Sequence, residues 1–252
     1  MAATPAWVAP GRGGGWLPHG FHLAAHSHTE GQLVYTAKGS VATVTERGTW
    51  VAASDRVTWT PPGFEHSHRF YGPTDVRVIP VEPHQGAELA PFPGVFAVSP
   101  LLREVLLTLT ERPGRAEVAG RLLAVAIDEV GLTPQRSVQL PEPYDDRLRA
   151  VAGLLHEDPS RTTTLAELGR SVGASERSLS RLFHTELGLS FHRWRTILRI
   201  HHGLAHLADG RSVTDTAVLC GWSNPSSFIE AFTEIIGQTP GRYQAGLRVD
   251  RP

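Results

Sequence analysis

This sequence of 252 residues lacks the features of a secreted, membrane-spanning or strongly charged protein. It has one cysteine, Cys220, which excludes a disulfide within the chain and makes a reducing compartment the expectation. No apolar run approaches the roughly 18 residues of a membrane span, and no secretion signal stands at the N-terminus, so we expect a cytoplasmic protein. The 24 basic and 25 acidic residues nearly cancel, so any binding to nucleic acid must depend on a local cluster of charge.

Strand-forming residues alternate with turns in the first third of the chain. Residues 1–20 are rich in alanine, proline and glycine, which predicts a flexible arm. From residue 21 onward, short segments of β-branched and aromatic residues are separated by glycine and proline, a spacing typical of a small β-barrel or jelly roll. The expected strands are residues 32–36, 40–45, 49–51, 56–59 and 76–81.

Helical periodicity replaces this pattern after residue 98. Apolar residues recur at i, i+1, i+4, i+5 and i+8, first from Leu101 and again from Leu122, and Pro113-Gly114 separates the two stretches. We therefore expect two short helices within 99–132, which could simply cap the barrel. Prolines over 133–143 then predict a linker to a second domain.

Histidines in the barrel region follow a spacing that indicates a metal site. The pattern is His26-x-His28-x3-Gln32, followed by Pro61-x-Gly63-x2-His66. Residues two apart in a strand point to one face, so His26 and His28 are expected to converge. Three imidazoles would suit Zn, Ni, Cu or Fe.

The same pattern resembles the two motifs of cupins, which implies a cupin-like barrel over 21–98. In cupins, two histidines, an acidic residue and a later histidine meet inside the barrel. The resemblance implies metal ligands at His26, His28, Gln32 and His66. Gln32 stands where cupins usually have glutamate, which removes a charged ligand. The alternative is that the histidines are hydrogen-bonding groups in a pocket for an organic effector, and His68 is expected to be exposed or to support the ligands.

The last hundred residues predict two helix-turn-helix units joined by one long helix. Thr164-x-x-Glu167 is a capping box, Gly173 supplies a turn and Ser175 can cap the next helix. Apolar positions at i, i+3 and i+4 then give that helix one core face and one basic, polar face. The pattern is repeated with a cap at Ser212, a turn at Gly221 and Asn224-Pro225, and a helix over about 191–207 joins the two units.

This C-terminal region, over 144–246, resembles the AraC/XylS family of transcription regulators. The resemblance is carried by Ser178-Leu179-Ser180-Arg181-Leu182-Phe183, Gly188-Leu189-Ser190-Phe191, Trp194-Arg195, Arg199-Ile200, Ser212-Val213, Ala217, Gly221-Trp222, Phe228, Ala231-Phe232, Gly237-Gln238-Thr239-Pro240 and Tyr243. It implies an α+β multidomain protein, with a cupin-like sensor before an all-α DNA-binding domain. In this family, helices like those expected over 99–132 commonly form the interface of a homodimer.

Matching to the family places candidate DNA-reading residues on the second helix of each unit. Two such helices would enter successive major grooves, about 34 Å apart. One departure is Thr233-Glu234, where the family usually has basic residues, and this leaves phosphate contacts of the second unit in doubt. Arg195 and Arg199 could bind phosphates or pair with acids such as Asp215 or Glu167. The candidates for base contacts are Arg177, Ser180, Arg181, Pro225, Ser226, Ile229 and Glu230.

The sequence therefore predicts a transcription regulator that binds double-stranded promoter DNA and responds to a small effector or a divalent transition metal. Two alternatives stay open. One is a metal-dependent cupin enzyme with an appended DNA-binding domain, which the glutamine at position 32 and the lack of an obvious general base disfavour. The other is a regulator whose barrel serves only to dimerise.

Overall fold

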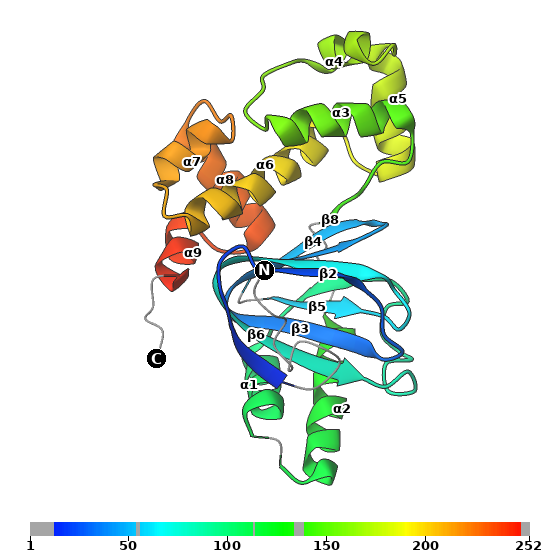
Figure 1. The fold of residues 1–252 in the computed structure, drawn as a ribbon, viewed down its shortest axis with the longest axis vertical. Helices are drawn as coiled ribbons and strands as arrows, with labels where there is room; N and C mark the ends of the chain where they lie inside the picture. Colours follow the sequence, from blue (N-terminus) through cyan, green and yellow to red (C-terminus); the bar gives the residue numbers. More distant parts are fainter. Residues whose placement is uncertain (1–12, 54–55, 113, 134–138, 248–252) are drawn as a thin grey trace. The chain divides into compact units, whose positions relative to one another are not determined.

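The structure is a computed structural model that describes residues 13–53, 56–112, 114–133 and 139–247 (Figure 1). The chain divides into two compact units, with the main division between residues 138 and 139. We call the first the β unit and the second, over 139–245, the helical unit. Within the described ranges, no helix is long and apolar enough to cross a membrane.

The β unit is an antiparallel sheet built around two long strands, β3 and β6. Strand β6 pairs with β1, β2 and β3, while β5 joins β3 to β7. The expectation that the N-terminal region is built of β-strands is thus confirmed. The strands are β1 (Gly13–Leu17), β2 (His22–His26), β3 (Gly31–Thr45), β4 (Gly48–Ala53), β5 (Arg56–Thr60), β6 (His66–Val81) and β7 (Gly94–Ala97), and a short β8 (Gln139–Leu140) follows later in the chain.

Both faces of the long strands are covered by apolar side chains. On β3, Leu33 and Tyr35 belong to one buried cluster and Val34 to another, because alternate residues of a strand point to opposite faces. Helices α1 (Pro100–Glu111) and α2 (Ala116–Leu132) supply the first cluster with buried leucines and alanines. These two helices confirm the prediction that was made from the helical periodicity after residue 98.

Two expectations about the strands were wrong. Residues 32–36 and 40–45 form one strand, because Gly39, at φ +77°, lets the chain shift register against β6 without leaving it. The predicted flexible arm is also wrong over 13–17, which form β1, while residues 1–12 lie outside the described residues. Glycine is needed in β1 because a Cβ at Gly14 would lie 2.5 Å from Cδ of Arg77.

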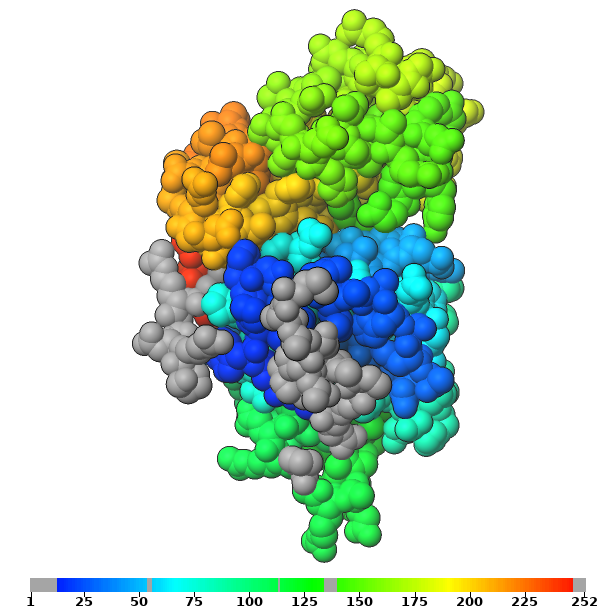
Figure 2. Space-filling view, in the orientation of Figure 1, coloured from blue at the N-terminus to red at the C-terminus, as the bar shows by residue number. Residues whose placement is uncertain are grey.

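The helical unit contains both expected helix-turn-helix units. Side chains at the predicted positions cap the helices: Thr164 and Glu167 form the capping box, and Ser175, Ser212 and Asn224 each accept from a backbone amide. Figure 2 shows α3 and α4 on the face in view, coloured green to yellow-green. The helices are α3 (Asp146–Glu157), α4 (Leu165–Ser171), α5 (Glu176–Leu187), α6 (Phe191–Ala208), α7 (Val213–Leu219), α8 (Pro225–Ile236) and α9 (Pro240–Leu247).

A buried histidine lies in the core of the helical unit. His201, on α6, is 7% exposed, and its Nε2 has no hydrogen-bond partner among the described residues. Burial lowers the pKa of His201 to about 3, and the neighbouring His202 and His156 lower it further by charge repulsion. The ring is therefore neutral in the folded protein at pH 7.

We predict that Gly31→Ala destabilises the β unit. A Cβ at Gly31 would lie 2.1 Å from Cη2 of Trp59, whose ring is 1% exposed and cannot move aside. Such overpacking costs about 1–3 kcal/mol, which urea unfolding would measure. Gly120→Ala, in α2 where a Cβ meets nothing within 4 Å, is the matched control and should leave the unfolding free energy equal or higher. Equal stability of the two variants would contradict the tight contact at Trp59.

We predict that His201 makes the helical unit less stable in mild acid. The pKa of His201 is lower in the folded than in the unfolded protein, so the unfolded chain takes up the extra proton as the pH falls. The contribution of the neutral His201 to the free energy of unfolding is therefore present above pH 6.5 and is lost progressively as the pH drops toward 3. Between pH 7.5 and 5.5 the expected loss is about 1.4 kcal/mol. His201→Met should remove that part of the loss in urea titrations followed by tryptophan fluorescence. The exposed His192→Gln should retain the loss, and an unchanged pH dependence in His201→Met would refute the assignment.

Candidate metal centre and nucleic-acid interface

The sheet register brings together the histidines of the two sequence motifs. His26 ends β2 and is the Cα partner of His66, the first residue of β6. His28 lies in the turn after β2, so the expectation that it shares a strand face with His26 was wrong. The turn is held because the amide of Gly63 donates to the carbonyl of His28 at 2.9 Å. One potential ligand atom from each of His26, His28 and His66 lies within 4.8 Å of the others.

Backbone carbonyls orient the three imidazoles. Nδ1 of His26 lies 2.9 Å from the carbonyl oxygen of Ala24, Nδ1 of His66 lies 2.8 Å from that of Phe64, and Nδ1 of His28 bonds to that of Glu30. A carbonyl can only accept, so Nδ1 carries the proton in each ring and Nε2 is left with its lone pair. Metal-binding histidines commonly donate the proton of their other ring nitrogen to a carbonyl or carboxylate in this way. The Nε2 atom of His28 is buried and has no partner among the described residues.

Gln32 and His68 lie next to this group. Nε2 of Gln32 is 2.8 Å from Nε2 of His66 and 3.1 Å from Nε2 of His68, so the amide donates one hydrogen to each ring. The Nδ1 atom of His68 is 3.1 Å from the hydroxyl of Thr43. His68 is 3% exposed, which corrects the expectation that it could be exposed. Its contact with Gln32 makes it a supporting residue of the histidine group.

Burial keeps the rings of His66 and His68 uncharged. Desolvation lowers the pKa of His66 to about 4, against the opposing effect of its bond to Phe64, and neighbouring His26 and His28 lower it further. The pKa of the fully buried His68 is also lowered, mainly by desolvation and then by the charges of His66, His26 and His28. At neutral pH both rings are therefore neutral, which is the form that binds a metal ion.

The space beside the histidines is small. A cavity of about 120 Å³ is lined by residues that include His28, Glu30 and Gln32. Deeper in the sheet, a space of about 10 Å³ borders His26 and His68. The first volume suits a few small-molecule atoms and the second at most one water, whereas pockets for drug-sized ligands occupy about 300–1,000 Å³.

The first helix-turn-helix presents a polar face on α5. Ser175 caps this helix, and Leu179, Phe183 and Leu187 are buried. Arg177 and Arg181 are exposed and Ser180 is half-buried. These three candidates for base contacts therefore lie off the core face of α5, as the sequence predicts.

In the second unit, α8 begins with the cap at Asn224 and buries Phe228, Phe232, Ile235 and Ile236. The candidates for base contacts are accessible to different extents: Ser226 and Glu230 are exposed, Pro225 is half-buried and Ile229 is 36% exposed. Glu234, at the position where the family pattern is basic, pairs with Arg193 of α6 at 2.9 Å. This acid thus links two helices of the unit.

Arg195 and Arg199 bind neither Asp215 nor Glu167. Arg195 Nη1 donates to the carbonyl of Thr163 at 3.0 Å, and Arg199 donates to two carbonyls of the same loop. No sequence pattern marks these backbone acceptors, because a carbonyl is present at every residue. The only available signal was the i, i+4 spacing of the two arginines, which places them on one side of a helix.

The chain is similar to known proteins in its helical unit and over most of its length. A family model described as a helix-turn-helix domain matches residues 168–246. The chain is 32% identical over 230 residues to the HTH-type transcriptional regulator NimR of Escherichia coli, covering 90% of this chain and 84% of NimR. It is 35% identical over 106 residues to the regulator RipA of Corynebacterium glutamicum, covering 42% of this chain and 32% of RipA. The solved structure of ToxT from Vibrio cholerae O395 covers 95% of this chain and 98% of its own, with a TM-score of 0.42 and 11% identity.

Two helix-turn-helix units on one connecting helix, following an antiparallel β unit, define the class of two-domain transcription regulators that bind DNA. The similarity to NimR covers 90% of the chain, more than the helical unit alone can account for. The chain belongs to the AraC/XylS family of transcription regulators.

Proposed function

We propose that this protein is a regulator whose β unit binds a divalent transition metal through His26, His28 and His66 and thereby alters promoter binding. The observation that carries the proposal is the hydrogen bonding of the three rings. Each Nδ1 donates to a backbone carbonyl, and Nε2 of His28 is buried with no partner in the part of the chain that the structure describes. A metal ion accepting these lone pairs would satisfy the orphaned nitrogen, and three imidazoles favour Zn, Ni, Cu or Fe.

Gln32 has a distinct part in this proposal. Its amide donates to Nε2 of His66, so this bond must be released before that lone pair can bind a metal. The Gln32 side chain is then free to present its oxygen as a neutral fourth ligand. A neutral set leaves the bound ion with its full charge, and this supports a reversible, weaker site than the usual set with glutamate.

We assign base reading in the first helix-turn-helix to Arg177, Ser180 and Arg181, which lie on α5 away from its buried face. Arginine is the commonest reader of guanine in the major groove. In the second unit, Pro225, Ser226, Ile229 and Glu230 occupy the corresponding helix, where Glu230 would accept from cytosine or exclude other bases. The assignment is supported by exposure and by the matching positions in two capped helices.

We place a homodimer interface on α1 and α2. Their inner sides pack in the β unit, and Leu101 and Leu132 remain 53% and 82% exposed. Large exposed apolar side chains on an accessory helix pair are typical of a surface that a partner covers. A dimer would also double the number of DNA contacts, which matters in a chain with no net positive charge.

The metal proposal predicts that purified wild-type protein holds a transition metal in stoichiometric amount, measured by elemental mass spectrometry. His28→Ala and His66→Ala should lose it, because each removes one of three ligands, while His192→Ala on α6 should retain it. Gln32→Glu should tighten metal binding about tenfold or more in a competition titration, since it adds a charged ligand. Wild-type protein that takes up none of the four metals when they are supplied at micromolar concentration would refute the proposal.

The DNA assignment predicts that Arg181→Ala weakens binding to the promoter of its own gene by about 1–3 kcal/mol, roughly five- to 150-fold in Kd. It should also relax the preference at one base pair, which a panel of single-base substitutions would show. Arg242→Ala on α9 removes the same charge from an exposed side chain outside the proposed contacts and is the control. Equal losses on all sequences would instead make Arg181 a phosphate contact.

A further inference from the structure

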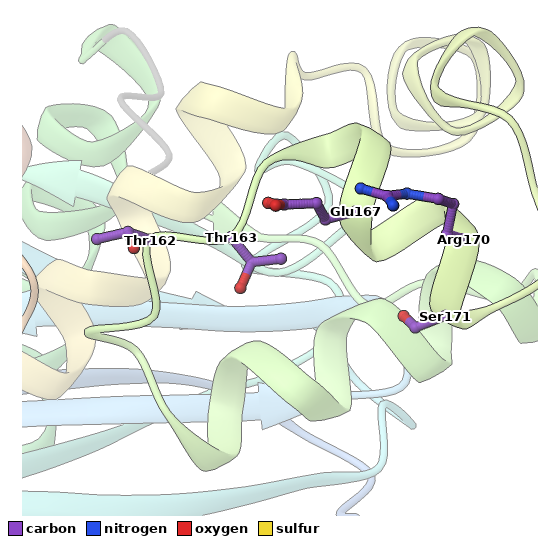
Figure 3. A pocket seen from close by; sticks show the side chains of 5 residues that line it. All are labelled: Thr162, Thr163, Glu167, Arg170 and Ser171. Atoms are coloured by element: carbon purple, nitrogen blue, oxygen red, sulfur yellow. The ribbon is translucent and has the colours of Figure 1, made fainter.

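Two arginines on α6 bind the backbone of the loop that leads into α4. Arg199 donates from Nε to the carbonyl of Pro159 at 2.8 Å and from Nη2 to that of Arg161 at 3.1 Å. One turn earlier, Arg195 donates to the carbonyl of Thr163. We call residues 158–163 the α4 loop, and Figure 3 shows its last two residues leading into α4, with Glu167, Arg170 and Ser171 beyond them around an open depression.

The α4 loop is itself closed by a local turn. The carboxylate of Asp158 accepts from the amide of Ser160 at 3.1 Å and from its hydroxyl at 2.6 Å. Immediately after the loop, Thr164 caps α4. Because the loop is fixed at both ends, the bonds from Arg199 help to hold the start of the first helix-turn-helix against α6.

Arg199 also contacts the second helix-turn-helix. Its guanidinium lies 5.6 Å from the ring centroid of Trp222, in the turn between α7 and α8, and Trp222 packs on the buried Phe228 of α8. Gly221 makes this approach possible: it has φ +79°, and a Cβ there would lie 2.7 Å from both Arg199 Nη2 and the carbonyl oxygen of Ser160. The turn of the second unit and the α4 loop of the first therefore meet at one side chain.

We propose that Arg199 is a positioning residue that holds the two recognition helices α5 and α8 at one separation, so that the protein accepts paired half-sites at one spacing only. A planar guanidinium can donate to two carbonyls and stack on an aromatic ring at the same time, and a lysine cannot. Rigid linkage makes the second half-site contact intramolecular and strongly dependent on geometry. The proposal rests on the proposed reading of bases by both units.

The test uses the full-length protein and operators selected from a random duplex library. From the best site, duplexes are made with one or five base pairs inserted between the half-sites, and Kd is measured by fluorescence anisotropy at fixed salt. One base pair shifts and rotates the second half-site slightly, whereas five place it on the opposite side of the duplex. The variants are Arg199→Met, Arg199→Lys and, as a control of equal charge, Arg242→Met on α9.

With one inserted base pair, we expect wild-type protein and Arg242→Met to lose about tenfold in affinity, and Arg199→Met to lose threefold at most, with Arg199→Lys between them. With five inserted base pairs, the second helix-turn-helix cannot reach its half-site, so wild-type protein and all variants should lose the same share of their affinity. If Arg199→Met keeps the tenfold penalty, or if selection yields a single half-site, the positioning role is wrong. If selection yields no preferred sequence at all, the proposed base reading fails as well.

A measurement without DNA tests the same role when a variant binds DNA poorly. Spin labels are attached to cysteines that replace the exposed Thr185 of α5 and Thr214 of α7, in a Cys220→Ala background. Electron–electron double resonance then reports the distance between the two helix-turn-helix units. Arg199→Met should broaden the distance distribution while circular dichroism shows unchanged helix content. An equally narrow distribution in a folded Arg199→Met or Arg199→Lys protein would overturn the proposal.

Discussion

Backbone carbonyls that turn away from regular secondary structure need hydrogen-bond donors, and this requirement shapes both units of the protein. In the β unit the donors are the Nδ1–H groups of His26, His28 and His66. In the helical unit they are the guanidinium groups of Arg195 and Arg199. In each case a turn is stabilised and a functional side chain is oriented by the same bond, so the fold and the site cannot be varied independently.

The parts of this structure that depend on neighbouring residues could be predicted from the sequence. Caps at Thr164, Ser175 and Asn224 were predicted because each cap is completed within three residues. The features that depend on distant residues could not be predicted in this way. The glycine-rich sequence of β1 resembles a linker, but its Gly14 lies against Arg77, more than 60 positions away along the chain.

The candidate metal site shows the same limit. The motif spacing predicted which histidines meet, and the register of β2 against β6 brings them together. It did not predict that Gln32 would bridge His66 and His68, because a glutamine amide can donate to two acceptors and only the fold decides which. A glutamate at position 32 would accept rather than donate, and would need protonated rings or a cation beside it. The glutamine therefore satisfies the neutral rings of His66 and His68, while Nε2 of His28 receives no hydrogen bond from it.

The positions of the arginines explain why geometry must matter for DNA binding by this protein. Five arginines lie between residues 175 and 202, but they do not act as one basic patch. Arg195 and Arg199 are bound to the α4 loop, and Arg193 is paired with Glu234. Arg177 and Arg181 are left on the face of α5, so counterion release from this segment is small. We therefore expect affinity to come mainly from simultaneous contacts of the two helix-turn-helix units, which is what the proposed positioning role of Arg199 on α6 would provide.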